Sequence, residues 1–364
     1  MKIKTRACGI LFLFIVLLSG TVLQADELKR NLERTVAEYL ARDDFQNAAQ
    51  SCLNYLDKFP DKCYPYILLG KVYEDSGDMI KAMDIYLQAL DRNQYCYSIY
   101  YKLGKIYFSL GKYKLALKYL FDLEKIYTES ESETGGDIIE PVNPYMINKS
   151  IGKNLFILND YSHSITYFEK AITANPYDLE IYSFLQTAYD NLSDKDSSQA
   201  YSEMANLMRA RKDLGLKKYK IVSGIIFLKY KKYKKALEQL NLVLEEDRNN
   251  IILNYNMGLL YLLTNNYPNA LPFIQRTVDL YNKKTRVSRF FHRLFRIDSQ
   301  GAKYHLVLSL AFYLNRETEQ AKMVFQQIKR YDNHVFNSYS FKDFADKSSP
   351  IYRDLADMYE FPKL

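Results

Sequence analysis

Residues 63–96 read CYPYILLGKVYEDSGDMIKAMDIYLQALDRNQYC, and residues 97–130 read YSIYYKLGKIYFSLGKYKLALKYLFDLEKIYTES. Laid one over the other, these two blocks share Leu-Gly at positions 7 and 8, Tyr at position 11 and Ala at position 20. Gly224 and Gly258 keep the same spacing of 34 residues further along, although the chain has only 13 glycines. A fixed period of this length predicts a helical repeat array, in which each unit packs on the next.

The residue types at the repeated positions fit a pair of packed helices. Positions 4, 7, 8 and 11 form one stripe of a first helix, and positions 20, 24 and 27 form a facing stripe of a second. Small residues at positions 8 and 20 would let the two backbones approach closely. Ser76-Gly77-Asp78, Leu110-Gly111-Lys112 and Asn159-Asp160 lie between the stripes, where the chain is expected to reverse.

This pattern resembles the tetratricopeptide repeat (TPR) family, whose unit is a pair of antiparallel helices, although the family's tryptophan is absent. The resemblance implies an all-α, right-handed superhelical solenoid of about eight helix-turn-helix units. Three units fall in 29–130 and four in 145–284, of which 179–214 is degenerate because Gln186 replaces the small residue and the second helix looks displaced. The last unit falls in 302–335, and the units start at residues 29, 63, 97, 145, 179, 217, 251 and 302.

Three segments lie outside the repeats. Residues 131–144 are acidic with Gly and Pro, which is typical of a surface loop. Residues 336–364 are expected to form a tail that caps the array, with a helix within 350–361. Residues 285–301 predict a basic amphipathic helix that contacts an anionic membrane or a partner, or else packs on the array with its charges in water. Its basic and aromatic side chains are Arg286, Arg289, Phe290, Phe291, Arg293, Phe295 and Arg296.

The N-terminus has the pattern of an export signal. Lys2, Lys4 and Arg6 precede an apolar run that is short for a membrane span, and small and polar residues follow. Residues 1–25 are therefore expected to be a signal peptide, or alternatively an uncleaved anchor. Either reading places the rest of the chain in the periplasm or on the periplasmic side of a membrane.

The cysteines past this signal are Cys52, Cys63 and Cys96. An odd number without regular spacing does not describe a disulfide framework. Free thiols are the favoured reading, with Cys52 as a small core residue. The leading alternative is a bridge between Cys52 and Cys63.

The sequence lacks the motifs of catalysis. The four histidines are scattered, and there is no phosphate-binding loop, nucleophile elbow or metal-binding cluster. We therefore expect no enzyme activity and no cofactor. A formal net charge of +7 over 364 residues gives no reason to expect nucleic acid as a partner.

The resemblance to TPR proteins also indicates a binding groove, which that family lines with positions 2, 5, 9 and 12 of the first helices. In this chain those positions are basic and aromatic, which would suit an acidic peptide segment; the alternative is lysines on solvated helix faces. The candidate residues are Tyr64, Lys71, Tyr101, Lys105, Lys149 and Lys153, with Phe108 and Phe156 beside them.

In the last three units the same positions are apolar, including Ile225, Leu259 and Leu310. Exposed patches of this kind are unusual. We expect the aromatic C-terminal tail to cover them, with a partner helix as the alternative.

The function expected from these observations is a non-enzymatic scaffold or adaptor that binds other proteins in a cell-envelope assembly. Two alternatives stay open: a periplasmic binding module for a peptide or envelope polymer, and an accessory subunit of an envelope enzyme.

Overall fold

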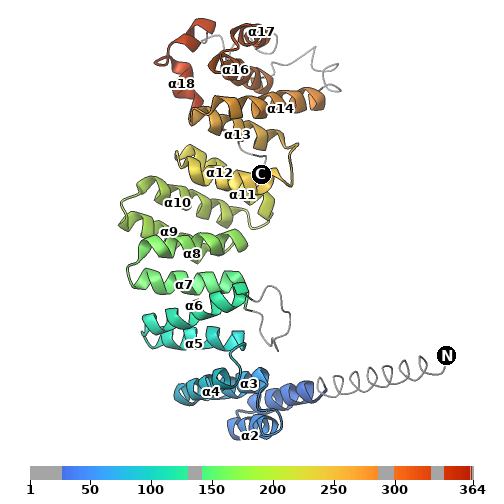
Figure 1. The fold of residues 1–364 in the computed structure, drawn as a ribbon, viewed down its shortest axis with the longest axis vertical. Coiled ribbons are helices and arrows are strands. Elements are labelled where there is room, and N and C mark those ends of the chain that lie inside the picture. Colours follow the sequence, from blue (N-terminus) through green and yellow to red (C-terminus); the bar gives the residue numbers. More distant parts are fainter. Residues whose placement is uncertain (1–26, 130–141, 286–298, 329–339, 361, 363–364) are drawn as a thin grey trace, which may run out of the picture. The chain divides into compact units, whose positions relative to one another are not determined.

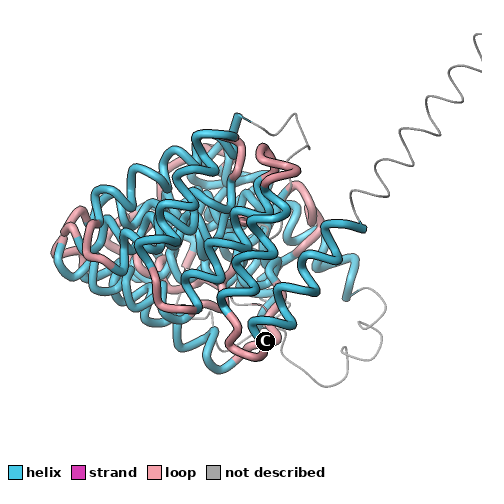
Figure 2. Tube along the Cα trace, turned by 90° about the horizontal axis from the view of Figure 1, so that it is seen from below, coloured by secondary structure: helices cyan, strands magenta, loops and turns pink. Residues whose placement is uncertain are grey.

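The computed structural model describes residues 27–129, 142–285, 299–328, 340–360 and 362. These residues form helices joined by short loops, with no strand among them (Figures 1 and 2). The chain divides into two compact units, Met1–Ala174 and Asn175–Leu364. The predicted signal or anchor at 1–25 and the arginines of the predicted amphipathic helix lie outside the described residues.

The N-terminal unit is a stack of helix pairs (Figure 1). Residues 27–40 are helical and pair with α2 (Phe45–Leu56). Each later helix packs on its neighbours in the chain. The following pairs are α3 (Cys63–Asp75) with α4 (Met79–Arg92), α5 (Tyr97–Ser109) with α6 (Tyr113–Glu129), and α7 (Pro144–Ile157) with α8 (Tyr161–Ala174).

The C-terminal unit continues the same arrangement and ends in two short elements. Its pairs are α9 (Leu179–Asn191) with α10 (Lys195–Ala210), α11 (Leu216–Lys229) with α12 (Tyr233–Leu244), α13 (Ile251–Leu263) with α14 (Tyr267–Thr285), and α16 (Ser299–Leu314) with α17 (Thr318–Ile328). A 3-10 turn, η1 (Phe341–Ala345), and the helix α18 (Pro350–Leu355) follow. None of the described helices is long and apolar enough to cross a membrane.

The turn inside each helix pair has the same backbone in all eight pairs of the described chain. The residue at position 15 has a positive φ, between 55° and 83°. The next residue donates its backbone N–H to the carbonyl of position 11, over 2.8–3.0 Å, and the second helix begins at position 17. The residues at position 15 are Asp43, Gly77, Gly111, Asn159, Ser193, Lys231, Asn265 and Arg316.

The pair at 179–214 therefore keeps the register of the others, and the expectation of a displaced second helix is wrong. Ser193 supplies the positive φ of 59° without a glycine. The side chain of Asp194 then accepts a hydrogen bond from the backbone N–H of Ser197 and caps α10. The same cap occurs in a pair that has glycine at position 8, where Asp78 accepts from the backbone N–H of Lys81.

Two predicted boundaries also move. Pro144 ends the predicted loop 131–144 but is the first residue of α7. The side chain of Asn143 accepts a hydrogen bond from the backbone N–H of Met146 at 2.9 Å. The last pair begins with α16 at Ser299, three residues before the expected start at 302.

A disulfide joins Cys63 to Cys96, with their Cα atoms 5.6 Å apart. The favoured reading of free thiols and the alternative bridge from Cys52 to Cys63 are both wrong. Cys52 is buried in the core between the first two pairs and is free. Cys63 begins α3 and Cys96 directly precedes α5, so the period of the repeat brings the two starting ends of successive first helices together.

Candidate partner-binding grooves

A cavity of about 500 Å³ lies between α5 and α7 in the N-terminal unit. Four of the six candidate groove residues line it: Tyr101 and Lys105 from α5, and Lys149 and Lys153 from α7. The remaining lining residues are Gly104, Phe108, Ser109, Tyr145, Met146, Ser150 and Asn154.

Helical spacing explains why these side chains meet. Tyr101 and Lys105 are four residues apart on α5, and Lys149 and Lys153 are four apart on α7, so each pair shares one helix face. The opposite face of α5 is held in the core by buried Leu103. Fixing that face in the core leaves the other face of α5 to line the cavity.

The cavity is basic and aromatic. The ammonium of Lys153 lies 5.9 Å from the ring centre of Phe108, and that of Lys149 lies 6.0 Å from the ring centre of Tyr145. Lys105 is exposed, and none of the lining residues in the described chain is acidic. Three positive charges in a concave, partly apolar site favour an occupant with carboxylates.

Asn154 lies at the wall of the cavity but is almost fully buried. This residue is 1% exposed, and its side-chain N–H donates to the carbonyl of Ser150 at 2.8 Å. Its amide oxygen is buried and has no partner within the described chain. Such an oxygen is unusual, because buried polar atoms are almost always paired.

Two predicted groove residues lie elsewhere. Tyr64 was expected to line the groove, and this is wrong: it is 2% exposed, with its ring 5.1 Å from that of Tyr55 in the core between the first two pairs. Position 2 of this helix faces the preceding pair, so the large ring is buried there. Lys71 is exposed on α3 but does not line the cavity.

Phe156 packs on the rings of Tyr161 and Phe168 within its own helix pair. Sequence reasoning missed Tyr145 and Asn154. Tyr145 could have been found, because it lies one helical turn before Lys149 on the same face. The unpaired oxygen of Asn154 has no signature in the sequence.

In the C-terminal unit, the apolar first-helix positions are buried, and the tail packs on this part of the molecule. The rings of Phe341 and Phe344 lie 5.8 and 5.7 Å from that of Tyr313, and Tyr359 packs against the core around α11 and α13. The expectation that the tail covers part of this apolar surface is therefore confirmed at Tyr313 and at the cluster around α11 and α13. The buried positions include Ile221, Ile225, Leu228, Tyr255, Leu259, Leu262, Leu306 and Leu310.

Three stretches of the chain match the family model of the tetratricopeptide repeat: residues 65–96, 97–120 and 150–178. They fall within the region of α3 to α8, but the third begins inside α7, after Tyr145 and Lys149 of the cavity. In these three stretches the chain is similar to tetratricopeptide repeats. Repeats of this kind typically mediate protein–protein contacts through their stacked helices.

Two curated relatives carry weaker, longer similarity. A TPR repeat-containing protein of Methanocaldococcus jannaschii is 19% identical over 304 residues, which are 79% of this chain and 47% of the relative. A DnaJ homolog subfamily C member 3 homolog of Dictyostelium discoideum is 20% identical over 294 residues, 81% of this chain and 51% of the relative. The chain thus spans about half the length of both.

Among solved structures, a crystal structure of MamA is 19% identical, with a TM-score of 0.41, and the match covers 49% of this chain and 95% of that one. MamA from Desulfovibrio magneticus RS-1 is 13% identical, with a TM-score of 0.41 and coverage of 51% and 97%.

Proposed function

We propose that this TPR-containing chain is a non-enzymatic scaffold or adaptor of a cell-envelope assembly, and that the cavity between α5 and α7 holds an acidic segment of a partner protein. The observation that carries the proposal is the convergence of Lys105, Lys149 and Lys153 with aromatic rings on one concave surface. Shape and apolar walls would give contact area, and the three ammonium groups would select for acidic sequence.

The placement in the envelope rests on two supports. The basic and apolar N-terminal sequence has the pattern of an export signal. The bridge between Cys63 and Cys96 favours an oxidising compartment, where disulfides form and persist. Fractionation with protease access to intact and permeabilised cells tests this, together with N-terminal sequencing. A chain recovered in the cytosol with Met1 in place would contradict export.

The binding proposal is tested with fluorescence anisotropy of a labelled acidic peptide containing one tyrosine. Replacing Lys105, Lys149 and Lys153 together with Gln should weaken binding about tenfold, since each partly exposed ion pair contributes up to about 1 kcal/mol. The loss should shrink at high salt.

The matched control changes three exposed lysines of the adjoining helix α6, Lys114, Lys118 and Lys125, to Gln. This variant has the same net charge as the cavity variant, so it should keep most of the affinity. Equal weakening by both triple variants would mean that overall charge attracts the peptide and that the cavity does not hold it.

The arginine-rich segment at 285–297 is proposed as a further contact with an anionic membrane or a partner. Electrostatic attraction to anionic lipid contributes about 1 kcal/mol per basic residue near the surface. Changing Arg286, Arg289, Arg293 and Arg296 to Gln should weaken binding to vesicles that contain phosphatidylserine. If binding is kept and the thermal midpoint falls, the segment is a packed structural helix.

A further inference from the structure

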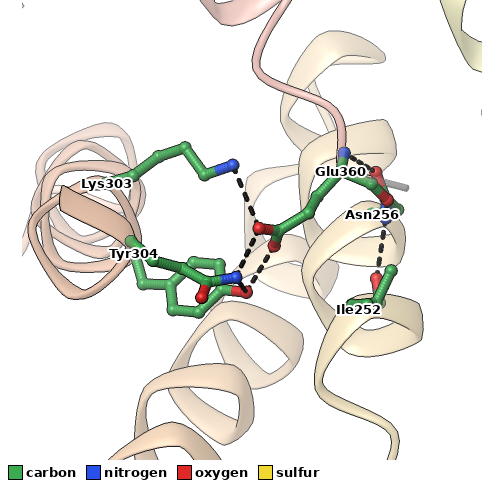
Figure 3. A network of polar contacts seen from close by, with 6 residues as sticks. Ile252, Asn256, Lys303, Tyr304 and Glu360 are labelled. Atoms are coloured by element: carbon green, nitrogen blue, oxygen red, sulfur yellow. Dashed lines mark hydrogen bonds and ion pairs between the residues drawn. The ribbon is translucent and has the colours of Figure 1, made fainter. Parts of the chain in front are cut away.

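Residue Glu360, near the C-terminal end, is held by two helices of different repeats. Its backbone N–H donates to the side-chain oxygen of Asn256 on α13 at 3.0 Å, and its carbonyl accepts from the side-chain nitrogen of Asn256 at 2.8 Å (Figure 3). The same nitrogen also donates to the carbonyl of Ile252, one turn earlier, at 2.8 Å. Asn256 is fully buried, so both ends of its amide depend on these partners.

The side chain of Glu360 is held by α16. Its carboxylate accepts hydrogen bonds from the hydroxyl of Tyr304 and from the side chain of Gln300, and the ammonium of Lys303 lies 3.5 Å away. Figure 3 shows the carboxylate between α13 and α16, with these groups directed at it. Burial, and then the contact with Glu360, raise the pKa of Tyr304, which keeps its hydroxyl protonated as a donor.

The residue before it, Tyr359, packs against an apolar cluster that includes Ile225 of α11 and Met257 of α13. Two successive residues of the tail therefore contact different kinds of group. The ring of Tyr359 packs on an apolar surface. The backbone of Glu360 pairs with the amide of Asn256, and its carboxylate contacts the polar and cationic side chains of α16. These are the elements by which a groove recognises an extended peptide.

The tail differs from the elements on which it lies. Residues 358–360 have no helical structure of their own, and α18 is only 6 residues long. The receptor groups, by contrast, belong to α13 and α16, which are fixed by their partner helices in the repeats. The groups that contact the tail thus lie on helices of the repeats, and the tail is an addition to the array. The surface of α13 and α16 that Glu360 covers is here called the groove.

We propose that the groove of α13 and α16 is a peptide-binding site that the chain's own tail occupies as an internal ligand, and that a partner segment with an aromatic residue followed by an acidic one displaces it. This goes beyond the cavity between α5 and α7, which is a separate surface in the other unit. The apparent affinity of such a site for an external segment is the intrinsic affinity multiplied by the fraction of molecules in which the tail has left the groove.

The test uses the full chain and a labelled synthetic peptide of residues 350–364. Glu360→Gln in the chain removes the charge that Lys303 and Tyr304 hold, so the internal tail should bind less well and the groove should be open more often. The peptide should then bind this variant at least about tenfold more tightly than the wild type. The same peptide carrying Glu360→Gln should lose that gain.

Glu319→Gln is the matched control, because Glu319 is exposed on α17 and far along the chain from the tail contacts. It should leave peptide binding at the wild-type level. Circular dichroism of each variant checks that the helices are intact.

Hydrogen exchange of the wild type gives a second measurement that needs no substitution. The N–H of Glu360 should exchange faster than the interior amides of α13, and saturating peptide should speed it further. No gain in peptide binding by a folded Glu360→Gln chain, or a Glu360 amide that exchanges only when α13 itself unfolds, would overturn the proposal and make the tail a permanent cap.

Discussion

A Cβ atom on Gly258 would lie 2.2 Å from the Cδ1 atom of Ile274, on the facing helix of the same pair. This contact joins position 8 of the first helix to position 24 of the second. It recurs in four other pairs, where an added Cβ would come within 2.2–2.9 Å of Tyr86, Leu120, Phe168 or Leu240. Glycine inside a helix costs about 1 kcal/mol relative to alanine, and the close packing of the two helices offsets this cost.

Gly258→Ala should therefore destabilise the chain although alanine favours helix. Overpacking costs about 1–3 kcal/mol, and the gain in helix propensity returns up to about 1 kcal/mol of it. We expect the free energy of unfolding to fall by about 1–2 kcal/mol in urea denaturation. Gly215→Ala shows the effect of a Cβ where space is free, because no atom lies within 4 Å of a Cβ there. Gly215 is the N-cap of α11, so this variant should gain nothing from helix propensity and should lose less than Gly258→Ala. A more stable Gly258→Ala variant would contradict this prediction and mean that the side chain of Ile274 moves away from the new Cβ without cost.

Substitutions of Gly77 test the contribution of the positive backbone φ at the turn, separately from side-chain packing. Its φ is +83°, and no atom lies within 4 Å of an added Cβ. Gly77→Ala should lower the free energy of unfolding by about 1 kcal/mol, because alanine is strained in this conformation. Gly77→Asn should cost less, since Asn159 and Asn265 occupy the same position in other pairs. Equal losses for both variants would show that the turn conformation is not the cause.

The repeat could be predicted from sequence because its determinants are local and periodic. Gly70 and Gly104 mark positions where the facing helix leaves no room for a side chain, and Gly77 and Gly111 mark the turns. The pair at 179–214 was harder to predict, because Gln186 replaces the small residue that marks position 8 in other pairs.

The cavity was predictable only in part. The groove positions implied by the resemblance to the TPR family identified Lys149 and Lys153. The burial of Tyr64, at another of those positions, depends on which side of α3 the preceding pair covers. The disulfide, like the burial of Tyr64, depends on tertiary structure. Cys63 and Cys96 are 33 residues apart in sequence, and only the stacking of successive helix pairs brings them together.

Acid should weaken an ion pair between two repeats of the C-terminal unit. The ammonium of Lys232, in the turn before α12, lies 2.6 and 2.8 Å from the two carboxylate oxygens of Asp194. Partial burial raises the pKa of Asp194, but the hydrogen bonds from Lys232 and Ser197 together outweigh it, so the pKa lies below its usual value. The stabilisation is therefore complete above the ordinary aspartate pKa of about 4 and is lost as the pH falls through the lower folded value.

Asp194→Asn should lower the free energy of unfolding by about 1 kcal/mol at pH 7, because the pair is partly exposed and screened. The stabilities of variant and wild type should converge towards pH 2, where the carboxyl is protonated in both states. Asp196→Asn removes a charge from the same first turn of α10 and controls for the helix dipole. A difference between Asp194→Asn and wild type that stays constant from pH 7 to pH 2 would contradict the ion-pair explanation.

Reduction of the bridge between Cys63 and Cys96 should destabilise the N-terminal unit. The bridge closes a loop over α3 and α4, and a disulfide of this kind contributes about 2–4 kcal/mol. Reductant should lower the free energy of unfolding of the wild type by that amount. It should have no effect on the variant carrying Cys63→Ala and Cys96→Ala, which should already be less stable.

Alkylation of the cysteines followed by mass spectrometry tests which of them form the bridge. Burial raises the pKa of the Cys52 thiol to about 12, so Cys52 should not be alkylated at pH 8 in the folded protein. It should be alkylated once denaturant is added, with no reductant needed. Cys63 and Cys96 should be alkylated only when denaturant and reductant are both present. Labelling of Cys63 or Cys96 in the denatured, unreduced protein would show that the bridge is absent.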